Sequence, residues 1–184
     1  EVTYLQPDRQ GAITAGQLAQ ALRPDTILVA MMLVNNELGS IYPIADIAKG
    51  LKAVNEKTLL HTDAVQGFLK VPFSAKALGA DFIAISGHKV GAPKGIGALY
   101  IGPRVRNPRP LLPGGGQEMG LRSGTEATAQ IAGFAKAVEL RWDHLEDKLR
   151  HMAEVKAYAV EKLTAIPDLQ IIGDGKAPHV LSGS

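Results

Sequence analysis

The sequence has 184 residues, enough for one domain or for one domain and part of another. Its 20 basic and 18 acidic side chains are nearly balanced and form no dense Lys/Arg run, which argues against a nucleic-acid partner. No apolar run approaches the roughly 20 residues that span a bilayer, and the absence of cysteine excludes disulfides, thiolate metal sites and a cysteine nucleophile within these residues.

The first half of the chain predicts alternating strands and helices. Residues 26–33 form a continuous apolar run, typical of a strand buried on both faces. Pro43 stands where a helix begins, because apolar residues follow it at helical spacing up to Val54. Further strands are expected at 58–62, 81–86 and 97–101, with a one-turn helix between Ser74 and Gly79. This order favours an α/β fold with a mixed, mostly parallel sheet and helices on both faces.

The second half predicts a different organisation. Residues 103–116 are rich in Pro, Gly and Arg and are expected to be irregular. A helical pattern then runs from about 125 to 163, and a late strand is expected at 168–172. Near residue 145 the helical pattern changes from apolar to charged. We therefore predict a large domain over residues 1–145 and the start of a smaller C-terminal domain over 146–184.

Three polar clusters each follow an apolar strand directly: residues 35–37, 61–66 and 86–89. In an α/β sheet, ligands gather at the carboxyl ends of the strands, so these clusters predict a binding site at one edge. Taken alone, Lys89 fits a surface loop and Asp63 fits a turn or a helix cap. Read together, they fit a lysine amine that forms a Schiff base and a carboxylate that pairs with a protonated pyridine nitrogen.

The order of five motifs carries a resemblance to a known family. NNELG, HTDAVQ, SGHK, PKGIGALY and GGGQEMGLRSGTE follow one another from residue 35 to residue 126. In this order and spacing the sequence resembles the NifS/IscS-like cysteine desulfurases. These are class V aminotransferases with the fold type I of enzymes that use pyridoxal 5'-phosphate (PLP), and the sheet would belong to their large domain.

The resemblance implies a role for each matched residue. Lys89 would carry PLP and move protons, Asp63 would hold the ring nitrogen, and Gln66 would bind the ring's phenolic oxygen. Ser86 and His88 would contact the phosphate, with His88 also a candidate catalytic residue. Asn36 would lie beside the phenolic oxygen and the substrate carboxylate. Thr125 would reach the phosphate of a neighbouring subunit, which implies a homodimer.

The same resemblance implies an activity and a setting. The enzyme would convert L-cysteine to L-alanine and pass sulfur, as a persulfide, to an acceptor protein for iron–sulfur clusters or thiolated tRNA. We expect a cytoplasmic protein with neither membrane nor direct nucleic-acid binding. In the family, the persulfide cysteine and the carboxylate-binding arginine lie beyond the position of Ser184, and a phosphate-binding turn precedes residue 1. We therefore expect a central fragment that is incomplete on its own.

Two alternatives remain open from the sequence. Another class V enzyme such as a selenocysteine lyase shares the motifs, and an inactive piece could serve as a dimerisation or scaffold module. A dinucleotide-binding domain is rejected, because no GxGxxG follows a strand. His144 and His151 are expected to be solvated rather than metal-binding, so no metal is predicted.

Overall fold

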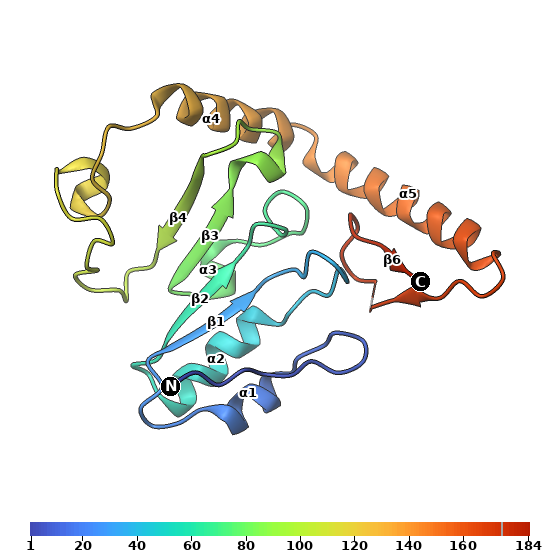
Figure 1. Ribbon diagram of the computed structural model, residues 1–184, viewed down its shortest axis with the longest axis horizontal. Coiled ribbons are helices and arrows are strands. Elements are labelled where there is room, and N and C mark those ends of the chain that lie inside the picture. Colours follow the sequence, from blue (N-terminus) through green and yellow to red (C-terminus); the bar gives the residue numbers. More distant parts are fainter. Residues whose placement is uncertain (174) are drawn as a thin grey trace.

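The computed structural model describes residues 1–173 and 175–184, and its centre is a four-stranded sheet (Figure 1). The strands are β1 (Leu28–Met32), β2 (Leu59–Asp63), β3 (Phe82–Ser86) and β4 (Gly97–Ile101), in the spatial order β1-β2-β3-β4. The first three are parallel and β4 is antiparallel to β3. The predicted mixed, mostly parallel sheet is therefore confirmed, with strand ends shifted by no more than two residues.

Three helices cover the N-terminal half of the sheet. They are α1 (Ala15–Ala21), α2 (Ile44–Val54) and α3 (Ala75–Leu78), and α2 contacts both of the others. Ile44, Ile47 and Leu51 of α2 are almost fully buried, in one cluster with Val29 of β1 and Leu60 of β2. The 3.6-residue period of α2 puts these apolar residues on one face, so their burial fixes the helix against the sheet.

Local signals set the ends of the short helices. Ser74 accepts a hydrogen bond from the Ala77 amide, and Gly79 ends α3 with a φ of 65°. Both ends are as predicted. α1 was not predicted; its start is a capping box in which Thr14 and Gln17 each accept the other's backbone N–H.

One prediction about the sheet is wrong for the described residues. The strand at 26–33 was expected to be buried on both faces, but in β1 only Val29 is buried, while Leu28 and Met32 are 49% and 38% exposed. The reason is that α1, α2 and α3 gather on the Val29 side of β1. Within the described ranges, no helix covers the second face of this strand.

The predicted helical stretch from 125 to 163 is two helices, α4 (Thr128–Trp142) and α5 (Leu145–Thr164). The break lies at Asp143, which is extended, and His144, which has a left-handed φ of 55°. α4 packs on the short 3-10 helix η1 (Gly87–Val90) that follows β3. The break lies beside the predicted domain boundary at 145, and that boundary stays a prediction.

The end of the chain returns toward the sheet (Figure 1). β5 (Ile171–Ile172) and β6 (Ser182–Gly183) form a separate antiparallel pair. Between them, Ala177 is fully buried and its amide donates to the carbonyl of Gly39. A second 3-10 helix, η2 (Gln117–Gly120), lies in the irregular segment after β4. Among the described helices, none is long and apolar enough to cross a membrane.

Candidate functional site

The carboxyl ends of β1, β2 and β3 meet at one edge of the sheet. Met32, the last residue of β1, is in register with Asp63 of β2, and Asp63 is in register with Ala84 of β3. η1 begins immediately after β3 and carries His88 and Lys89. The sheet therefore brings the three predicted polar clusters to the same edge, as the position of strand ends requires.

The turn after β1 contains two adjacent asparagines, Asn35 and Asn36. The side-chain oxygen of Asn35 accepts the backbone N–H groups of Glu37 and Leu38, at 2.9 and 2.8 Å. The Asn35 amide donates to the carbonyl of Ser40, which closes the turn. Asn35 is thus a structural residue of this turn, and the residue after it, Asn36, is exposed.

Asp63 ends β2 with an exposed carboxylate. One of its oxygens accepts the backbone N–H of Val65 at 2.9 Å, which orients the side chain. The next residue, Ala64, is fully buried and donates to the carbonyl of Ala84. An exposed carboxylate on a buried, hydrogen-bonded stem has a fixed direction and can pair with a cationic N–H group.

The turn from β3 into η1 is tightly built. The Ser86 hydroxyl and Nδ1 of His88 share a hydrogen bond of 2.8 Å. A Cβ at Gly87 would lie 2.8 Å from a side-chain carbon of Ile96, so only glycine fits between Ser86 and His88. Lys89 follows and is exposed, which leaves its amine accessible from solvent.

A buried lysine that sequence reasoning missed lies behind this edge. Lys70 is 9% exposed, and its ammonium donates to Oε1 of Gln66 at 2.9 Å. The pKa of Lys70 is lowered to about 8, first by burial and then by the positive charges of Arg141 and Lys89. The only sequence signal was its place four residues after Gln66.

Arg141 and His179 were also missed as neighbours of the site. Arg141, on α4, donates from Nε to the carbonyl of Val90, so α4 brings its charge to η1. Both ring nitrogens of His179 are buried, and the pKa of His179 is lowered to about 4 by burial and then by the charges of Lys70 and Lys156. The backbone of Gln66 acts in the opposite direction. Nothing in the local sequence of 177–181 indicates this contact.

Among the described residues, no hydrogen bond or ion pair connects Thr125 with the residues at this edge. It is exposed, three residues before α4 begins. The segment that contains it, between β4 and α4, runs out to the side of the sheet (yellow in Figure 1). A role for Thr125 in a neighbouring subunit therefore stays a prediction.

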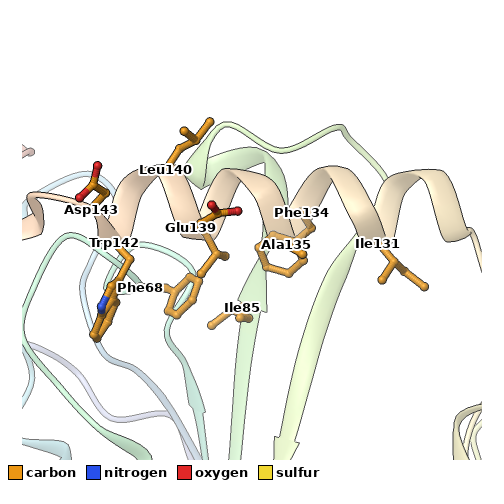
Figure 2. Close-up of a pocket in the computed structure, with 10 residues that line it drawn as sticks. Phe68, Ile85, Ile131, Phe134, Ala135, Glu139, Leu140, Trp142 and Asp143 are labelled. Atoms are coloured by element: carbon orange, nitrogen blue, oxygen red, sulfur yellow. The ribbon is translucent and has the colours of Figure 1, made fainter.

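An apolar hollow lies apart from the polar edge. It measures about 810 Å³ and lies under α4, lined mainly by apolar side chains that include Phe68, Ile85 and Phe134. Figure 2 shows Trp142 pointing down from α4 on the same side of the helix as Phe68, while Leu140 points away from the sheet. None of the predicted site residues lines this hollow. In the described residues no group of three His, Cys, Asp or Glu side chains is placed to hold a metal.

Comparisons with known proteins agree on one family. The sequence model of the class-V aminotransferases matches residues 1–182. A probable mitochondrial cysteine desulfurase of Schizosaccharomyces pombe is 40% identical over 181 residues, 97% of this chain and 36% of the relative. The cysteine desulfurase IscS of Methanosarcina thermophila is 42% identical over 173 residues, 94% of this chain and 42% of the relative.

Solved structures give the same result. A NifS-like protein superimposes with a TM-score of 0.94 at 39% identity, over 100% of this chain and 50% of that protein. DndA from Streptomyces lividans superimposes with a TM-score of 0.90 at 39% identity, over 100% of this chain and 52% of that protein. The chain thus spans about half the length of these structures and less of the curated relatives.

Proposed function

The chain belongs to the class-V aminotransferase family, and from that premise we propose that it forms part of a PLP-dependent cysteine desulfurase. The reaction would convert L-cysteine to L-alanine and leave the sulfur as a persulfide. The observation that carries the proposal is the edge of the sheet, where Lys89, Asp63 and the Ser86–His88 pair follow neighbouring strands. The relatives' printed names support the substrate.

The residues present fit PLP. A phosphate carries about −1.5 to −2 charges at pH 7, and a hydroxyl beside an imidazole suits it. An amine suits its aldehyde, and the oriented carboxylate of Asp63 suits a protonated ring nitrogen. When bound, PLP would supply the electron sink for the carbon from which sulfur departs.

Each residue of the chain then has a defined task. Lys89 would attach the cofactor through its amine and take up or return a proton at Nζ. Asp63 would keep the ring nitrogen protonated, and Ser86 with His88 would hold the phosphate. Asn36 would donate its side-chain amide to the carboxylate of L-cysteine. The 184 residues contain no cysteine, so the persulfide has to form on a thiol outside them.

The proposal extends to partners. Thr125 would complete the phosphate site of a neighbouring subunit in a homodimer, and a separate protein would accept the sulfur for iron–sulfur clusters or tRNA thiolation. We propose a cytoplasmic location.

The attachment of the cofactor to Lys89 is directly testable. The full-length product of the gene is incubated with PLP, reduced with borohydride, digested and analysed by mass spectrometry. We expect the pyridoxyl group on the peptide that contains Lys89, because this lysine is exposed and directly follows the Ser86–His88 pair in the chain. Lys89→Ala is expected to lose the adduct and the desulfurase activity.

The matched control is Lys94→Ala, five residues away in an exposed loop. It should keep the adduct and the activity. An adduct distributed over several lysines, or normal turnover of L-cysteine by Lys89→Ala, would overturn the proposed function.

A further inference from the structure

The loop after β2 holds Gln66 and Lys70 in a fixed relation. The amides of Gly67 and Phe68 donate to the carbonyl of Ala64, and those of Lys70 and Val71 donate to the carbonyl of Gly67. Gly67 is also packed closely, since a Cβ there would lie 2.6 Å from the Leu33 side chain. Two consecutive turns therefore place residues 66 and 70 on the same side of the loop.

Lys70 determines which end of the Gln66 amide faces it. Its ammonium group has three donors and no acceptor, so it can bind only the carbonyl oxygen of the amide. The 2.9 Å contact from Lys70 Nζ to Gln66 Oε1 has this arrangement. None of the ion pairs among the described residues includes the buried Lys70, and the Gln66 side chain is its acceptor. The Nε2 donor of Gln66 is then the end left for another partner.

The titratable groups that interact with Lys70 lie on α4, on η1 and in the C-terminal segment. Arg141 on α4 and Lys89 on η1 are cationic, and the neutral His179 lies in the C-terminal segment. These cations, together with burial, bring the pKa of Lys70 to about 8. Above that pH the neutral amine can accept as well as donate, so its control over the amide weakens.

We propose that Lys70 is a positioning residue, whose ammonium holds the Gln66 amide with its Nε2 donor directed at the ring oxygen of the cofactor. The inference rests on the proposed function, because it needs a cofactor with a phenolic oxygen at Gln66. Lys70 lies outside the HTDAVQ motif, and in this proposal it orients the side-chain amide of Gln66, which lies inside the motif. A hydrogen-bond donor at the ring oxygen stabilises negative charge on that oxygen. It therefore favours the form of the cofactor in which this oxygen has lost its proton.

The test is a pH titration of the visible absorption band of the bound cofactor in the full-length gene product. Lys70→Met is expected to raise the midpoint by about one pH unit, the tenfold effect of losing a hydrogen bond to a charged group. Gln66→Ala should raise it equally, and the double variant should show no further change, because both substitutions remove the same contact. Lys70→Arg, which also only donates, should keep the wild-type midpoint.

The matched control is Lys76→Met, on the exposed side of α3, which should leave the midpoint unchanged. A second measurement needs no cofactor. The Gln66 side-chain amide resonance, assigned by its loss in Gln66→Ala, should shift in the cofactor-free protein as the pH passes through about 8.

The outcomes separate the two proposals. A borohydride adduct on Lys89 together with a wild-type midpoint in Lys70→Met would overturn the positioning role and leave the proposed function standing. An amide resonance that stays constant through about pH 8 would overturn it as well. Failure of the wild-type protein to form the adduct would remove the proposed function and, with it, this inference.

Discussion

His179 shows how one buried side chain links stability to pH. Its ring nitrogens are buried in the segment that returns to the sheet, close to Lys70 and Lys156. Burial and these two cations disfavour the imidazolium, so the pKa falls from 6.5 to about 4. Because the pKa is lower in the folded state, the unfolded chain takes up a proton between these values that the folded chain does not.

We therefore predict that the free energy of unfolding falls as the pH decreases from 6.5 to about 4. The expected loss is about 1–2 kcal/mol, less than the full shift implies because the ring is half-buried and solvent screens it. Urea unfolding at a series of pH values measures it. His179→Asn should flatten the curve over this range, while His151→Asn on exposed α5 should not. Equal slopes in His179→Asn and wild type would contradict the assignment.

Lysines 70 and 89 illustrate what residue-level reasoning can and cannot reach. Lys89 stands in a short motif directly after a strand, so its place at the carboxyl edge of the sheet was predictable from the sequence, and its chemistry stays a proposal. Lys70 follows a motif by four residues, and its interest comes from burial and from charges on α4 and η1. Lys89 and Arg141 lie 19 and 71 positions after Lys70 in the sequence. No local sequence pattern indicates that the three side chains are neighbours.

At the scale of elements, apolar runs and caps predicted the sheet well. β4 was predicted at its observed bounds, and Ser74 and Gly79 end α3 as expected. α1 was missed although its Thr14–Gln17 capping box is a recognised signal. The break between α4 and α5 could not be predicted, because neither Asp143 nor His144 is a Gly or Pro.

Tertiary and capping contacts explain that break. Lys148 donates to the carbonyls of Leu140 and Asp143, both at 2.6 Å, and so satisfies the C-terminal end of α4. His144 pairs with Asp143 and Asp147, but these exposed ion pairs contribute little. The left-handed backbone at His144 remains a local cost of about 1 kcal/mol that glycine would not have.

His144→Gly is therefore predicted to stabilise the protein by a few tenths of a kcal/mol to about 0.5 kcal/mol. The relief of the left-handed strain outweighs the greater freedom of glycine in the unfolded chain. His151→Gly, in the middle of α5, is the matched control and should destabilise by about 1 kcal/mol. The measurement is thermal or urea unfolding of both variants. A destabilised His144→Gly would mean that the side-chain pairs matter more than the backbone.

At the scale of the whole molecule, the open second face of β1 and the apolar hollow under α4 have the same consequence. Both leave large apolar side chains in solvent, including Leu28 and Met32 of β1 and Trp142 of α4. The relatives are more than twice as long as the segment that this chain matches. The mixed sheet was predicted correctly from apolar runs, whereas the open face of β1 was not, because burial depends on which elements pack there rather than on the strand's own residues.

The dimer prediction is the one that only the whole molecule can test. Thr125 is exposed in a segment that runs out from the sheet, whereas Lys89 lies at its carboxyl edge (Figure 1). If Thr125 completes the neighbour's phosphate site, Thr125→Ala should weaken cofactor affinity about tenfold, the loss of one hydrogen bond to a charged group. Lys89→Ala should abolish attachment.

Mixing the two variants then separates the geometries. In a hybrid dimer, the subunit that keeps Lys89 receives Thr125 from its partner, so one of its two sites is complete. Random exchange of equal amounts makes about half of the dimers hybrid, and about one quarter of all sites should recover wild-type affinity. Activity at limiting PLP, before and after subunit exchange, measures this. Recovery would place Thr125 in the neighbour's site, and no recovery would mean that it acts on its own subunit or not at all.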